Sequence, residues 1–173
     1  MARFEKPIAE IHASLQKLVG LHRQLLDVVR VEKEALIEAN LRAIQEATCS
    51  KQALIETIKQ EEVRRQQNVA ELAIVLKRPM KELTLLEIAI AVQGEEPRGA
   101  DQLRSAFNAL SILIKRVSDA NRENATLVER SLEHIREMKK NVLGDAHTSS
   151  NTYTQQGTRS NAPNGARLIE REA

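Results

Sequence analysis

The chain begins with apolar residues that recur every three or four positions, which is the spacing of one face of an α-helix. These positions are Ile8, Ile11, Leu15, Leu18, Leu25, Val29 and Leu36. Pro7 stands at the start of the run, where a first helical turn tolerates proline. Two polar residues, His22 and Glu32, interrupt the stripe. The pattern predicts a first helix over about residues 7–39.

A second apolar stripe starts at Leu41, directly after Asn40, a residue type that caps helix N-termini. It continues through Ile44, Ile55, Ile58, Val69, Leu72 and Leu76. Polar residues interrupt it at Thr48, Lys51, Glu62 and Arg65. Pro79 ends the pattern because proline cannot continue a helix. The sequence therefore predicts a second helix over about residues 41–77.

A short and strongly apolar segment follows the second helix. Thr84 and Glu87 have the spacing of a capping box, in which each side chain bonds to the backbone of the other residue. They predict a short helix over about residues 85–92, and a stretch rich in glycine and proline over residues 94–99 ends it. A helix of this length is not stable alone, so we expect it to dock on the long helices.

Helical spacing returns in the last third of the chain and predicts a helix over about residues 100–143. Its seam holds Phe107, Leu110, Ile114, Val117, Asn121, Asn124, Val128, Ser131, Ile135, Met138 and Val142. Leu127 and Leu132 widen the apolar stripe. Gly144 is predicted to stop the helix, since glycine commonly follows the last helical residue.

These elements predict an all-α fold, namely an elongated antiparallel coiled-coil bundle of three long helices plus a short connecting helix. Aromatic residues make up only 2% of the chain, so aliphatic side chains must pack the core, as they do at helix seams. The helices would form one domain over residues 1–143. Residues 144–173 are rich in Ser, Thr, Asn, Gln and Gly, so we expect a disordered C-terminal tail.

Charge and cysteine content narrow the class of protein. Lys and Arg number 26 against 24 Asp and Glu, a net charge of +2, which favours neither nucleic acid nor anionic lipid as a partner. Cys49 is the only cysteine, which excludes an internal disulfide and fits a reducing compartment. No stretch is long and apolar enough for membrane insertion, and the N-terminus lacks the apolar region of a signal peptide. We expect a cytoplasmic protein.

No pattern of residues indicates catalysis. None of the four histidines follows a glutamate by three positions, the spacing that helical di-iron sites use. His134 is followed at that spacing by Glu137, whereas histidine phosphotransfer domains typically have a lysine there. Phosphate-binding glycine loops and nucleophile elbows are also absent from the sequence. The sequence predicts a binding protein with no metal and no cofactor, and not an enzyme.

Polar residues within the seams have two interpretations. If the first two helices fold back at Asn40, Glu32 and Lys51 come close enough to form an ion pair that fixes their register. The alternative is that both side chains point outward. Asn121 and Asn124 could likewise set register against the first helix or take part in recognition, and the sequence leaves both open.

Three segments of the chain resemble the FlgN-type flagellar export chaperones, which guard the hook-associated (hook–filament junction) proteins. Residues 31–65 resemble the family's first helical turn-back, with Glu32, Leu36, Lys51, Leu54 and Glu61 ahead of Arg64 and Arg65. Residues 121–135 resemble its last-helix signature, with Asn121, Asn124, Leu127 and Val128. Residues 152–160 resemble a short tail element around Tyr153 and Gly157, although Thr154 and Gln156 depart from its usual residues.

The resemblance implies a chaperone that binds the C-terminal helical segment of hook-associated proteins and prevents their premature assembly. It also implies delivery of these clients to the cytoplasmic domain of the flagellar type III export gate. The client would lie on an apolar face of the last helix, made by Leu127, Val128, Leu132, Ile135, Met138 and Val142. Tyr153 would anchor the chaperone to the gate.

Other interpretations of the same residues stay open. The apolar stripe of the last helix could pack within the chain, and Tyr153 could have no role. In a further alternative, the protein is a structural coiled coil that assembles with itself. The sequence does not fix the oligomeric state, and we expect a monomer or a weak dimer.

Overall fold

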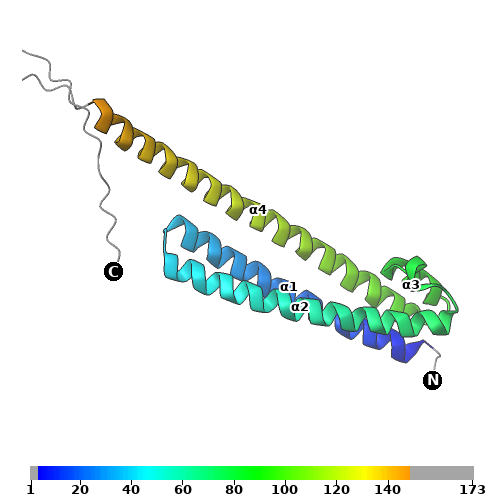
Figure 1. Cartoon of the computed structure of the whole chain (residues 1–173). Helices are drawn as coiled ribbons and strands as arrows, with labels where there is room; N and C mark the ends of the chain where they lie inside the picture. The colour runs from blue at the N-terminus through cyan, green and yellow to red at the C-terminus, as the bar shows by residue number, and fades with distance from the viewer. Residues whose placement is uncertain (1–3, 149–173) are drawn as a thin grey trace, which may run out of the picture. The chain divides into compact units, whose positions relative to one another are not determined.

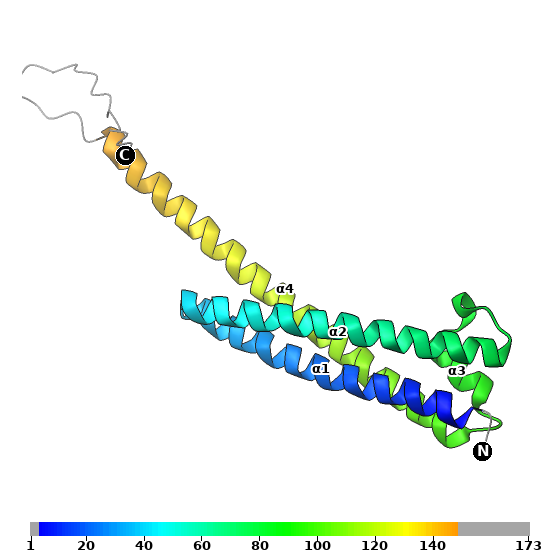
Figure 2. The same ribbon diagram turned by 60° about the horizontal axis from the view of Figure 1, so that its bottom comes forward.

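Residues 4–148 are described by the computed structural model, with side chains described for residues 4–142. Helices α1 (Glu5–Ile37) and α2 (Leu41–Leu76) lie side by side as an antiparallel hairpin (Figures 1 and 2). The chain divides into two units, Met1–Val128 and Glu129–Ala173.

The tight connection between α1 and α2 is built from two capping elements. Asn40 caps α2 as predicted, because its Oδ1 accepts a hydrogen bond of 3.2 Å from the Ala43 N–H. Ala39 has a φ of 52°, a left-handed conformation that is normally taken by glycine. The Asn40 N–H donates to the Ala35 carbonyl and the Ala39 N–H to the Leu36 carbonyl, and these bonds close the end of α1.

Between α2 and the last helix the chain makes two short helical elements. Lys77 ends α2 with a left-handed φ of 54°, and a 3₁₀ turn, η1 (Met80–Glu82), follows. Helix α3 (Leu85–Val92) starts with the predicted capping box. The Thr84 N–H donates to Glu87 Oε2 at 2.8 Å, and the Glu87 N–H donates to Thr84 Oγ1 at 3.3 Å.

Helix α4 (Pro97–Thr148) is longer at both ends than the sequence predicts. It begins at Pro97, where a proline in the first turn leaves no helical hydrogen bond unmade. The predicted stop at Gly144 is wrong, and so is the start of the tail there. Glycine ends a helix when it takes a left-handed conformation, but within a helix it only lowers stability by about 1 kcal/mol relative to alanine. The predicted disorder of residues 149–173 lies outside the described residues.

The core of the first unit forms where α1 meets α2, α3 and the part of α4 up to Val128. Its fully buried large side chains are Ile11, Leu15, Leu18, Val29, Leu72, Ile88, Val92 and Leu103. This part of α4 runs parallel to α1: Gly99 lies against Ile8, and Asn124 contacts Glu32. A β-carbon at Gly99 would come within 2.8 Å of Ile8 Cγ2, so glycine allows this close approach.

The predicted all-α class, with three long helices and one short connecting helix, is confirmed. In the second unit, the described residues continue α4 to Thr148. Every side chain of residues 129–142 is exposed.

Candidate functional site

Three polar side chains from three helices meet inside the first unit. We call Glu32 of α1, Lys51 of α2 and Asn124 of α4 the polar node. Lys51 Nζ donates to both carboxylate oxygens of Glu32, at 2.6 and 2.7 Å. Asn124 Nδ2 donates to Glu32 Oε2 at 2.9 Å and to the Val29 carbonyl at 3.0 Å. Of the two interpretations that the sequence allows for Glu32 and Lys51, the ion pair is therefore the one present.

The three side chains of the polar node are largely buried, so their interactions matter for the stability of the fold. The Glu32 and Lys51 side chains are 10% and 22% exposed, and Asn124 is 5% exposed. Ions at such depth are costly to leave unpaired, because little water remains to solvate them. Asn124 Oδ1 is buried and has no hydrogen-bond partner among the described residues. Asn121, for which the sequence left a register role and a recognition role open, is half-buried and lies outside these hydrogen bonds.

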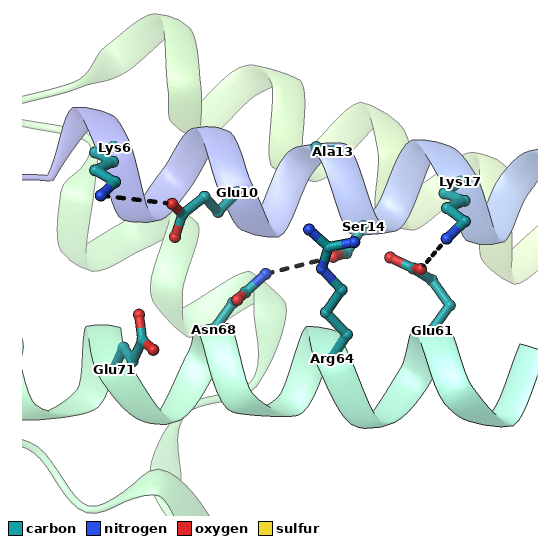
Figure 3. Close-up of a pocket in the computed structure, with 9 residues that line it drawn as sticks. All are labelled: Lys6, Glu10, Ala13, Ser14, Lys17, Glu61, Arg64, Asn68 and Glu71. Carbon is teal, nitrogen blue, oxygen red and sulfur yellow. Dashed lines mark hydrogen bonds and ion pairs between the residues drawn. The ribbon is translucent and has the colours of Figure 1, made fainter.

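A polar groove of about 490 Å³ lies between α1 and α2 (Figure 3). Glu61 is only 4% exposed and accepts a hydrogen bond of 2.5 Å from Lys17 Nζ. Asn68 Nδ2 donates to Ser14 Oγ at 3.4 Å, further along the groove. Cationic and anionic residues alternate along the walls: Lys6, Glu10, Lys17, Glu61, Arg64 and Glu71. This mixture favours neither an anionic nor a cationic ligand.

The Glu61 carboxylate is held in its charged form despite its burial. Burial raises the pKa of this carboxyl, but hydrogen bonds from Lys17 and Ser14 lower it, and so do the charges of Lys17 and Arg64. The hydrogen bonds and charges together outweigh the effect of burial, so the pKa of Glu61 lies below its usual value. We did not predict this groove from the sequence. No local pattern could have placed Glu61 near Lys17, because the two residues lie 44 positions apart on two different helices.

An apolar groove of about 330 Å³ lies between α2 and α4 in the first unit. Its apolar lining comes from Leu18, Ile58, Leu85, Phe107, Leu110 and Ile114. His22 also lines it and is half-buried, with Nδ1 2.8 Å from the Leu18 carbonyl oxygen. On the α2 wall, Arg65 donates two hydrogen bonds to Glu62. These hydrogen bonds hold the pKa of the Glu62 carboxyl below its usual value.

The residues predicted to bind a client belong to α4 but divide between the two units. Leu127 is half-buried in the first unit, and Val128 is 40% exposed. In the second unit, Leu132, Ile135, Met138 and Val142 are 48%, 58%, 55% and 70% exposed. Tyr153, the predicted gate anchor, lies outside the described residues.

Spacing places the four exposed apolar residues of the second unit on one side of α4. At about 100° per residue, Leu132, Ile135, Met138 and Val142 fall within an arc of about 120°. We call these four residues the apolar stripe. An apolar arc of this width is normally covered in a soluble helical protein, and large exposed apolar surfaces mark interaction sites.

The part of the chain with described side chains offers neither a metal site nor a membrane span. Residues 4–142 hold no cluster of three or more His, Cys, Asp or Glu side chains that could bind a metal ion. No helix in the described part of the chain is long and apolar enough to cross a membrane.

Long helices around an aliphatic core, with an apolar stripe exposed on one of them, define a protein of the all-α class. The family model described as FlgN protein matches residues 1–161. The chain therefore belongs to the FlgN family, a family of flagellar export chaperones. Comparison with curated proteins and comparison with solved structures each give no match.

Proposed function

We propose that this chain is a cytoplasmic chaperone that binds the C-terminal helical segment of flagellar hook-associated proteins. Binding prevents premature assembly, and the chaperone then delivers its client to the cytoplasmic domain of the flagellar type III export gate. The observation that carries the proposal is the exposed apolar stripe of α4, in a chain that belongs to the FlgN family. Leu127 and Val128, at the end of the first unit, are proposed as further contacts with the client.

The chemistry of the stripe supports a helical client. An amphipathic helix can lay its own apolar face on Leu132, Ile135, Met138 and Val142, which would remove both faces from water. Full burial of an aliphatic side chain contributes about 1.5–3 kcal/mol. Met138 adds an unbranched side chain that adapts to differently shaped partners.

The polar node has a proposed role in keeping the first unit in register. Glu32 can satisfy Lys51 and Asn124 together only at one alignment of α1, α2 and α4, and a shift by one turn would leave a buried charge unpaired. A register fixed in this way would keep α1, α2 and the first-unit part of α4 in one alignment. Asn121 is proposed to assist from the preceding turn.

The binding experiment compares two pairs of truncations on opposite sides of α4. Full-length chain is titrated with the C-terminal segment of a hook-associated protein, using calorimetry. Ile135→Ala with Met138→Ala should weaken binding at least tenfold, because two buried contacts are lost. Glu133→Ala with Glu137→Ala, on the opposite side, is the matched control and should change binding less than twofold. Equal effects of the two pairs would refute the proposed surface.

A self-assembling structural coiled coil is the alternative function. Light scattering after gel filtration distinguishes the two, because the chaperone is expected as a monomer or a weak dimer. A stable higher oligomer that keeps its stripe buried and ignores hook-associated proteins would favour the alternative.

A further inference from the structure

The charges beside the apolar stripe are not distributed evenly around α4. At about 100° per residue, Lys139 lies about 50° from the centre of the stripe, which is inside its arc and next to Leu132. Arg136 lies about 110° from that centre, beyond Leu132 on the same side. Glu133, Glu137 and Lys140 lie on the opposite side of the helix, about 145° or more from that centre. The other edge carries His134 and Asn141. The two cations therefore flank Leu132 on one side of the stripe, and we call this side, defined by Arg136 and Lys139, the cationic edge.

The two cations of this edge form no ion pair within residues 129–142. Both side chains are exposed, and neither forms an ion pair among the residues whose side chains are described. Lys139 has no carboxylate three or four positions away in either direction, so its own helix offers it no partner. By contrast, Arg136 has Glu133 three positions before it, a spacing that allows pairing, and Lys140 has Glu137 at the same spacing. Of the two cations, only Lys139 lacks a possible partner on its own helix.

We propose that the cationic edge selects an amphipathic helix that carries carboxylates along one border of its apolar face. This proposal rests on the proposed client-binding function and adds the chemistry of the client. When such a helix covers the stripe, its carboxylates come beside Arg136 and Lys139. Complementary charges at the border of an apolar contact speed association and fix orientation.

A second copy of the chain is a poorer partner for this edge. Each copy offers one carboxylate on that border, Glu129, which lies two turns before Arg136. The two cations of one copy therefore outnumber the carboxylates that the border of the other copy offers. A helix with two or more carboxylates on its border satisfies the edge completely, and this favours an acidic-edged partner over self-association.

The test uses the full-length chain and two synthetic amphipathic helices that have the same apolar face. One peptide carries glutamates along one border, and the other carries lysines at the same positions. The acidic-edged peptide should bind about tenfold more tightly at low salt, and this preference should shrink at high salt. Equal affinity for the two peptides, or preference for the lysine peptide, would overturn the proposal.

Charge-reversed variants then assign the preference to residues. Arg136→Glu with Lys139→Glu should remove the preference for the acidic peptide, whereas Lys140→Glu, a reversal on the opposite side, should retain it. Circular dichroism of each variant confirms that helix content is unchanged. If Lys140→Glu removes the preference equally, the edge is not the selector.

Separate measurements distinguish failure of this proposal from failure of the proposed function, and distinguish an acidic helix from other ligands of the stripe. In one outcome, Ile135→Ala with Met138→Ala abolishes binding of the hook-associated protein while the unaltered chain binds the two peptides equally. That result would overturn only the charge selection. Absence of hook-associated protein binding by the unaltered chain would overturn the function itself. Binding of the edge to anionic lipid vesicles, or self-association that the double charge reversal abolishes, would replace the acidic helix by a membrane or a second copy.

Discussion

Asn124 Nδ2 donates a hydrogen bond of 2.9 Å to Glu32 Oε2, and this bond ties α4 to α1 at the point where α1 also pairs with α2. The two residues are 92 positions apart in the chain. The same carboxylate also accepts hydrogen bonds from Lys51. The buried Glu32 side chain of α1 therefore contacts both α2 and α4. Loss of either donor would leave this buried carboxylate short of a partner.

Lys51→Met should lower the free energy of unfolding by about 2–3 kcal/mol, because it leaves the Glu32 carboxylate buried with only an amide donor. Urea denaturation measures the change. Arg42→Met, which breaks an exposed ion pair with Glu46 on the same helix, is the control and should have little effect. A Lys51→Met protein as stable as the original would show that the polar node does not hold the helices together.

Glu61 should make stability depend on pH in the acid range. Its folded pKa lies below the usual value of 4.5, so its ionised form stabilises the fold above that value. This contribution is lost as the pH falls through the folded pKa. The stability difference between the original protein and Glu61→Gln should therefore be full at neutral pH and should narrow below about pH 4.5. Denaturation at several pH values measures it.

The control for this prediction is Glu56→Gln, an exposed position on the same helix. Its stability difference from the original protein should be small at neutral pH and should vary less with pH. A Glu61→Gln difference that stays constant from pH 7 to pH 3 would contradict the role assigned to the Lys17–Glu61 pair.

Ala39→Gly should raise the free energy of unfolding by about 1 kcal/mol. Alanine at a φ of 52° is strained, whereas glycine takes this conformation freely. Ala53→Gly, at an exposed position inside α2, should instead lower stability by about 1 kcal/mol. Thermal unfolding of both variants gives the signs, and destabilisation by Ala39→Gly would show that its conformation is not strained.

Most of the fold follows from local sequence, because helical periodicity and caps are local properties. Asn40 and the Thr84–Glu87 box mark helix starts by their own hydrogen bonds, and all three act as predicted. Gly144 did not end α4, since glycine permits a left-handed turn without requiring one. The end of a helix therefore depends on the neighbouring residues as well as on the glycine itself.

The pairing of two polar side chains could be predicted from the sequence only where both residues lie near the same turn. Glu32 and Lys51 flank the short α1–α2 connection, so their pairing could be predicted. Glu61 lies 44 residues from Lys17, and its burial depends on how two long helices align over many turns. The separate behaviour of Asn121 and Asn124 also depends on rotation of α4 about its axis, and a seam pattern alone does not specify this rotation.

Tyr153→Ala should leave client binding unchanged and weaken engagement of the export gate. An aromatic ring in a polar segment can anchor a partner at low entropic cost. Pull-down with the cytoplasmic domain of the gate, in parallel with client titration, measures both effects. Tyr153→Phe is the conservative control and should keep most of the gate binding. Unimpaired gate binding and export by Tyr153→Ala would exclude the anchor role.

The most direct test of the account is hydrogen exchange of the full-length chain with and without the C-terminal segment of a hook-associated protein. The exposed stripe on α4 predicts that amides of residues 129–142 exchange much more slowly in the complex, because the client covers and stabilises this part of the helix. Protection confined to residues 4–128, with residues 129–142 unchanged, would contradict the central claim that the client binds on the apolar stripe.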